Sequence, residues 1–73
     1  MNIYYITFGQ SHSHVHNGIK LDYNCVGIIK AKSYSEMRIL AFKWFGNKFA
    51  TTYTVESFGD NIKLFPRGFI ELN

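Results

Sequence analysis

The sequence predicts a single small α+β domain over residues 1–73, in which one helix packs on a face of an antiparallel or mixed sheet in the order β-β-α-β-β. Three observations favour this fold class. Two stretches near the N-terminus are rich in β-branched and aromatic residues, a central stretch has the apolar spacing of a helix, and turn-forming residues separate them. A chain of 73 residues forms one domain with a thin core.

The first predicted strand, residues 2–8, has apolar side chains on both faces, which is typical of a central strand. A polar stretch then contains Asn17-Gly18, and this pair predicts a tight hairpin turn, because a type I′ turn needs two residues that tolerate positive φ. The second main strand is predicted over residues 23–31. Within it, Gly27 indicates a bulge or a close approach of another segment to the backbone.

The helix is predicted over residues 33–45. Ser33 and Glu36 have the spacing of a capping box, and Gly46-Asn47 provides the C-terminal stop. The apolar stripe has the spacing i, i+3, i+4 and i+7 and consists of Met37, Leu40, Ala41 and Trp44. Phe42 and Phe45 widen this stripe towards a partner.

The remaining elements are a strand over residues 49–55, a loop over 57–64, a turn at Pro66-Arg67-Gly68 and a closing strand over 69–72. One helix covers one face of the sheet only. We therefore expect the uncovered, aromatic face to be a candidate surface for a homodimer.

Composition narrows the classes of function. The net charge of +3 indicates a slight preference for an anionic partner, although no run of basic residues is present. The chain is short and rich in aromatic residues, so a pocket within one protomer is expected to be shallow. The single cysteine, the lack of a secretory signal pattern and the lack of a membrane-length apolar run indicate a cytoplasmic protein without a membrane partner.

The sharpest motif is His-Ser-His-Val-His, which on a strand places His12, His14 and His16 on one face. Three imidazoles suit a metal site with Asp22 or Cys25 as a fourth ligand, contact with phosphate, or acid–base chemistry. The plainer interpretation is a polar loop whose histidines make local hydrogen bonds. No spacing here specifies a catalytic triad, so we expect no enzyme activity, no cofactor and no metal, with the three histidines as weak metal candidates.

A second motif, Phe65-Pro66-Arg67-Gly68, places Arg67 between residues that form a rigid turn. An arginine held at such a tip is suited to bidentate contact with phosphate or carboxylate. The alternative is a surface arginine paired with a neighbouring acid. The expected contact surface is Gln10, His12, His14, Asp22 and Arg67, with Asn17 and Gly18 shaping the hairpin.

Nearly the whole chain resembles a group of small uncharacterised proteins encoded by tailed bacteriophages and prophages. The shared pattern comprises Phe8-Gly9-Gln10, His12 and His14, Asn17-Gly18, Asp22, residues 45–49 and residues 65–68. Because His16 is often another residue in such proteins, the resemblance counts against a three-histidine metal site. It implies a phage or prophage origin and action in the cytoplasm of a bacterial host.

We therefore expect a phage-type accessory binding protein with a role in counter-defence, which engages an anionic ligand such as a nucleotide signal, or a host factor, without turnover. One alternative is an inhibitor of a host immune effector that binds through its aromatic face. Further alternatives are a nucleic-acid-binding module, which is not favoured because RNA- and DNA-binding motifs are missing, and a hydrolase with a histidine-bound metal.

Overall fold

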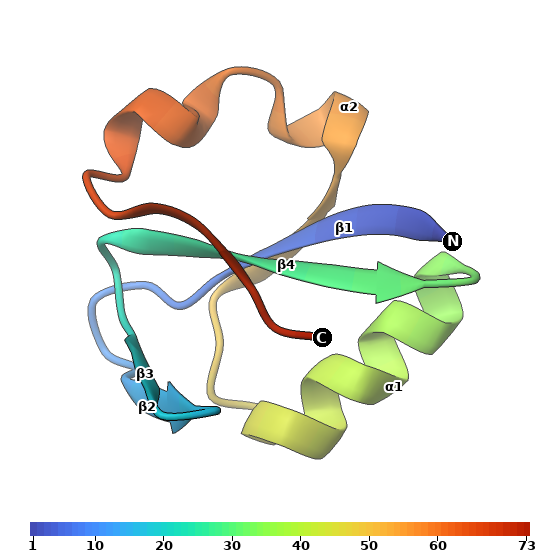
Figure 1. Ribbon diagram of the computed structural model, residues 1–73, viewed down its shortest axis with the longest axis horizontal. Helices are drawn as coiled ribbons and strands as arrows, with labels where there is room; N and C mark the ends of the chain where they lie inside the picture. The colour runs from blue at the N-terminus through green and yellow to red at the C-terminus, as the bar shows by residue number, and fades with distance from the viewer.

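The strand at the start of the chain lies in the interior of the sheet, as its two apolar faces predict. The computed structural model describes residues 1–73 and confirms an α+β fold. Strand β1 (Asn2–Thr7) pairs antiparallel with β4 (Cys25–Ala31) on one side and with β5 (Thr51–Thr54) on the other. Strand β6 (Gly68–Glu71) runs parallel to β4, so the sheet is mixed, with the order β5-β1-β4-β6 (Figure 1).

Helix α1 (Tyr34–Phe45) packs on one face of this sheet through Met37, Ala41 and Phe45. Its N-cap is Ser33, whose side chain accepts a hydrogen bond from the Glu36 backbone N–H at 3.1 Å. The Glu36 carboxylate accepts from the Lys32 N–H, one residue before the position that a capping box requires. None of the helices combines the length and the apolar character that are needed to span a membrane.

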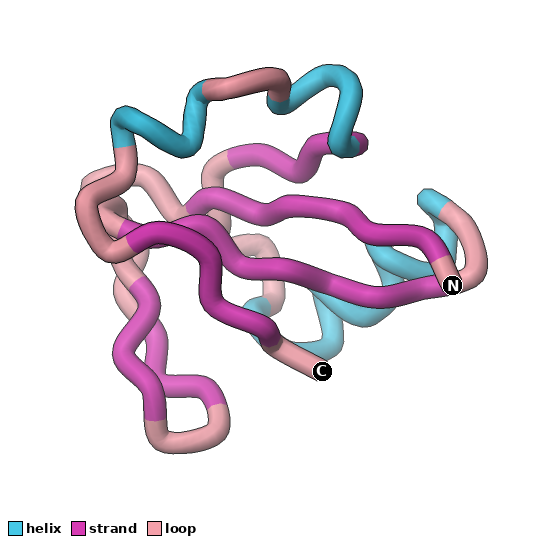
Figure 2. Tube along the Cα trace, turned by 45° about the horizontal axis from the view of Figure 1, so that its top comes forward, coloured by secondary structure: helices cyan, strands magenta, loops and turns pink.

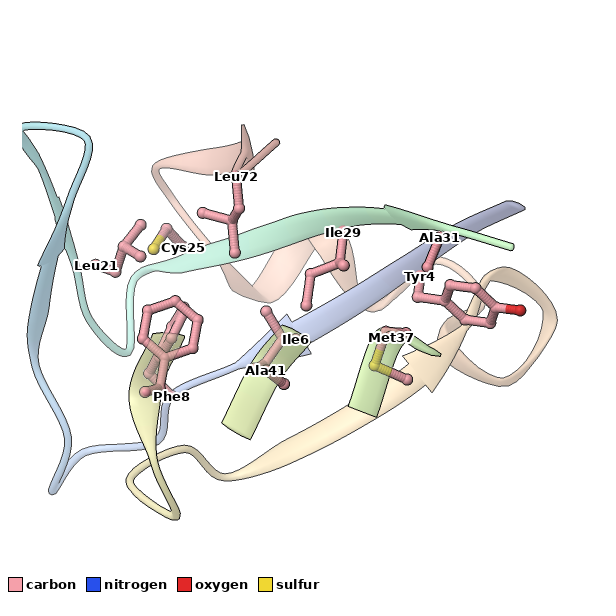
Figure 3. Close-up of a cluster of buried hydrophobic side chains, with 11 residues drawn as sticks. Tyr4, Ile6, Phe8, Leu21, Cys25, Ile29, Ala31, Met37, Ala41 and Leu72 are labelled. Carbon is pink, nitrogen blue, oxygen red and sulfur yellow. The ribbon is translucent and has the colours of Figure 1, made fainter. Parts of the chain in front are cut away.

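The main core lies between α1 and the sheet (Figure 3). Tyr4, Ile6 and Phe8 follow one another along the inner side of β1 and the residue after it, and Met37 and Ala41 of the helix lie against them. The other buried members are Leu21, Cys25, Ile29, Ala31, Phe45 and Leu72. Side chains from both ends of the chain therefore share one core.

Gly27 marks a close approach of two segments, one of the two possibilities that the sequence left open. A Cβ atom at this position would lie 2.6 Å from Leu72 Cδ1 and 2.8 Å from Ile6 Cγ2. The Leu72 side chain thus occupies the space that any larger residue would need, and it is almost fully buried there. The Leu72 N–H donates to the Ile28 carbonyl at 2.9 Å, which holds the end of the chain on β4.

The second face of the sheet is partly covered, which differs from the expectation of an open face. Helix α2 (Val55–Phe58) begins where the expected strand was to end and runs into the expected loop, which also contains the 3-10 turn η1 (Asn61–Leu64). Both lie on the side of the sheet opposite α1 (Figures 1 and 2). Phe58 is 2% exposed and its ring lies against Tyr5, Tyr53 and Phe69. One aromatic residue in a polar segment therefore closes much of this face.

The hairpin forms where Asn17-Gly18 predicts it. Strands β2 (His14–His16) and β3 (Ile19–Leu21) are joined by a turn in which Asn17 and Gly18 have φ values of 52° and 79°. These positive values are those of a type I′ turn. The hairpin lies beside the main sheet, on the same side as α1 (Figure 1), and Leu21 anchors it in the core.

Candidate functional site

The three histidines alternate with exposed residues, and the two that lie on strand β2, His14 and His16, point towards the body of the protein. His12, His14 and His16 are half-buried, whereas Ser13 and Val15 between them are exposed. The His14 Nε2–H donates to the Lys48 carbonyl at 2.6 Å, and its ring packs on Phe45. The side chains alternate as the sequence predicted, and the ring of His14 is turned towards the protein.

His16 repeats this arrangement at the tip of the hairpin. Its Nε2–H donates to the Leu72 carbonyl at 2.9 Å, and its ring centroid lies 4.8 Å from that of Trp44. Asn17 adds a longer hydrogen bond from Nδ2 to the same carbonyl, at 3.4 Å. Because a carbonyl oxygen only accepts, both His14 and His16 carry their proton on Nε2 and are committed to holding the hairpin in place.

The residues around the hairpin do not form a metal site. No group of three or more His, Cys, Asp or Glu side chains is placed to hold a metal ion. Of the two residues considered as a fourth ligand, Asp22 is occupied by other partners and Cys25 is fully buried. Burial raises the pKa of the Cys25 thiol, which disfavours the thiolate that a metal would bind.

Arg67 and Asp22 come together as an ion pair. Arg67 Nη1 lies 3.3 Å from Asp22 Oδ1, and the same carboxylate oxygen accepts from the Asn24 N–H at 2.9 Å. The Arg67 N–H in turn donates to the Asn24 carbonyl at 2.9 Å. The arginine therefore fastens its turn to the start of β4, as in the alternative that pairs it with an acid.

The expected contact residues thus fall into separate places. Asp22 and Arg67 bind each other, His14 is held against the end of α1, and Gln10 is exposed in the turn that follows β1. His12 is half-buried. Whether Gln10 and His12 contact a ligand stays a prediction.

The distribution of charge shows a different candidate site. Four basic residues lie between residues 32 and 48: Lys32, Arg38, Lys43 and Lys48. Glu36 is the single acid in this segment, which therefore carries the whole net charge of +3, while the four bases and four acids elsewhere cancel. Three of those four acids are in ion pairs, with Lys30, Lys63 and Arg67. The unpaired positive charge of the protein is concentrated on α1 and its flanks.

Among these charges, Arg38 has side-chain contacts that fix its direction. Its Nη1 donates to Thr52 Oγ1 at 3.1 Å, and its guanidinium lies over the rings of Phe42 and Phe49, at 5.0 and 5.8 Å from their centroids. No carboxylate lies within ion-pair distance of it. A guanidinium has five N–H donors in a rigid fork, so this arginine is oriented while most of its donors remain available.

Apolar side chains surround these charges on the outside of α1. Ile39 is 67% exposed, and Phe42 and Tyr34 are exposed by almost half. With the two bases nearest to them, they form a surface that we call the α1 face: Tyr34, Arg38, Ile39, Phe42 and Lys43. Of the two residues that the sequence predicted to widen the helix stripe towards a partner, Phe42 is exposed here and Phe45 is buried in the core. The spacing of Tyr34, Arg38 and Phe42, four residues apart, was the signal that could have indicated a second stripe.

The one cavity of the protein lies at the start of β1, beside the junction of β5 and α2. It has a volume of about 550 Å³ and is lined by Met1, Asn2, Ile3, Tyr4, Thr54, Val55 and Glu56. Glu56 is the only carboxylate among the lining side chains, and no histidine, cysteine, lysine or arginine joins it. The other polar side chains of the lining are those of Asn2, Tyr4 and Thr54.

Comparison of the chain with protein-family models, with curated proteins and with solved structures finds no match.

Proposed function

We propose that this chain is a binding protein without turnover, and that its α1 face docks on an acidic surface of a partner protein. The observation that carries the proposal is the placement of the whole net charge on residues 32–48. None of these four bases is in an ion pair within the chain. Unpaired charge on one surface attracts a partner of opposite sign and increases the rate of association.

The apolar part of the α1 face supports a protein as the partner. The centres of protein interfaces are enriched in aromatic residues and arginine, and Arg38 lies beside Phe42 and Ile39 in this way. Arg38 is already held by Thr52 and by two rings, so binding costs it little conformational entropy. A nucleic acid would use the same charges but would gain less from an exposed isoleucine.

Other features support binding without turnover. The imidazoles of His14 and His16 hold the hairpin, the Cys25 thiol is buried, and the cavity has a single carboxylate. None of these groups is paired with a base or nucleophile that could take part in a reaction. The aromatic face, which is the alternative contact surface, is partly covered by Phe58 and its neighbours.

We propose further that the partner is a factor of a bacterial host and that the binding serves counter-defence in the host cytoplasm. The support is the resemblance to small phage and prophage proteins. A nucleotide signal as the ligand has less support, because Arg67, the expected anion contact, is already paired with Asp22.

The test compares charge reversals on two surfaces. Lys43→Glu places a negative charge on the α1 face, and Lys20→Glu makes the same change on the exposed hairpin, away from that face. We expect the wild-type protein and Lys20→Glu to capture the same acidic protein from bacterial lysate. With that protein purified, calorimetry should show Lys43→Glu binding at least about tenfold more weakly, a loss of about 1.4 kcal/mol.

Equal binding by Lys43→Glu and Lys20→Glu would contradict the proposal. Nuclease treatment provides the second control. If it abolishes capture, and if affinity falls steeply with salt, the anionic partner is a nucleic acid instead of a protein.

A further inference from the structure

The sheet has two edge strands, and only one of them is open. An edge strand presents N–H and C=O groups that can pair with another chain. At the β5 edge, the Thr54 N–H donates to Ser57 Oγ at 3.0 Å, and the Ser57 hydroxyl donates to the Thr54 carbonyl at 3.2 Å. The cap of α2 therefore closes one end of a strand that is only four residues long.

The β6 edge has no such cover. The Leu72 N–H points towards β4, where it donates to the Ile28 carbonyl at 2.9 Å. Because the direction of the backbone groups alternates along a strand, Phe69 and Glu71 point their N–H and C=O groups away from β4. No second strand lies on this side of β6, and none of the turn, loop or side-chain hydrogen bonds uses these groups.

We propose that β6 pairs antiparallel with β6 of a second copy of the chain, so that two four-stranded sheets become one continuous sheet across a two-fold axis. Phe69 then lies opposite the partner's Glu71, and Glu71 lies opposite the partner's Phe69. Each such pair exchanges two backbone hydrogen bonds, so the dimer gains about four.

Charge selects a second copy at this edge. Glu71, the only charged residue of β6, is neutralised by Lys30 Nζ at 2.7 Å, and nearby Arg67 is paired with Asp22. Two copies therefore meet at β6 without net repulsion. At β5, the same pairing would bring together two unpaired Arg38 side chains, since Arg38 binds Thr52 of that strand.

Two further features suit an interface at β6. The strand contains no proline or lysine, which are residues that protect natural edges from pairing. Phe69 and Leu64, from β6 and the adjoining η1, are 42% and 70% exposed and provide apolar surface beside the new hydrogen bonds. The pairing uses no residue of the α1 face and does not depend on the proposed function.

The test is the mass of the untagged protein by sedimentation, over about a hundredfold range of concentration. Glu71→Pro removes one outward N–H, and a proline is tolerated at such an edge position because the β4–β6 ladder does not use that group. Glu71→Gln is the matched control, since it also removes the charge but keeps the N–H. We expect the wild-type protein and Glu71→Gln to reach twice the chain mass of 8.5 kDa, and Glu71→Pro to dimerise at least about tenfold more weakly.

A wild-type protein that stays monomeric at every concentration, or a Glu71→Pro variant that dimerises like wild type, would overturn the proposal. Amide hydrogen exchange gives a measurement that does not depend on any variant. The amides of Phe69 and Glu71 should become protected as the wild-type concentration rises, while that of Thr52 on β5 stays unchanged. If protection rises at Thr52 instead, the chains pair through the β5 edge, and the proposal is wrong.

Discussion

The hairpin and helix α1 differ from what their sequences suggest: the hairpin histidines have a structural role, and the ordinary helix is the candidate binding surface. The hairpin contains the motif most suggestive of chemistry, yet His14 and His16 donate to the carbonyls of Lys48 and Leu72 and so hold the fold together. The helix has an ordinary amphipathic pattern, yet the helix and its flanks, residues 32–48, contain four bases that are in no ion pair. Both carbonyls lie outside any helix or strand, and a backbone acceptor there still needs a donor. Conspicuous polar residues can therefore be structural where the chain leaves such acceptors.

The largest expected effect tests whether the hairpin belongs to the core. Leu21 is fully buried, so Leu21→Ala should lower the free energy of unfolding by about 2–5 kcal/mol. The matched control is Val15→Ala on the outer side of the same hairpin, where the side chain is 74% exposed and the cost should stay within about 0.5 kcal/mol. Urea unfolding measures both variants. Similar losses for the two would show that the hairpin is not docked.

A smaller effect is expected when the loss of His16, which holds the hairpin, is compared with the loss of Lys43, which is exposed on α1. His16→Ala leaves the Leu72 carbonyl short of a donor and removes the contact with Trp44, so it should cost about 1–3 kcal/mol. Lys43→Ala, on the exposed side of α1, should cost less than about 0.5 kcal/mol. Labelling of the buried Cys25 thiol provides a second readout, because it requires opening of the core. The comparison fails if Lys43→Ala destabilises the protein as much as His16→Ala does.

The smallest effect concerns the paired charges outside α1. A hydrogen bond from Lys30, followed by its positive charge, holds the pKa of Glu71 below its usual value of 4.5. The stabilisation is therefore complete above pH 4.5 and is lost as the pH falls through the lower pKa of the folded state. Glu71→Gln should have a slightly lower melting temperature than wild type at neutral pH, and the difference should vanish in acid. Because the pair is exposed, high salt should also reduce this difference in melting temperature. A difference that changes with neither pH nor salt would contradict the ion pair.

Local patterns in the sequence were sufficient for the strands, the hairpin turn and the helix. Asn17-Gly18 and Ser33 act within a few residues of themselves, so their structural effects can be predicted from the sequence. The partner of Arg67 could not be predicted in this way, because Asp22 lies 45 residues away along the chain. The same holds for the histidines: alternation along a strand defines a shared face, but only the tertiary fold decides which face meets the core.

The helix α2 illustrates a second limit. Four residues are too few to show a helical period, and Gly59-Asp60-Asn61 favoured a loop. Phe58 nevertheless pulls this segment onto the sheet, because its ring finds Tyr5 and Phe69 there. The α1 face was missed for a related reason. Arg38 can be recognised as unpaired only when the structure shows which acids the other basic residues bind.

The contact between Gly27 and Leu72 also bears on the order of events when the protein is made on the ribosome. Most of the other core residues precede residue 46, but the space above Gly27 stays unfilled until residue 72 has been synthesised. A nascent chain that lacks residues 68–72 has neither the parallel strand nor the acceptor for His16. The sheet and the hairpin therefore cannot reach their native packing before residues 68–72 have emerged from the ribosome.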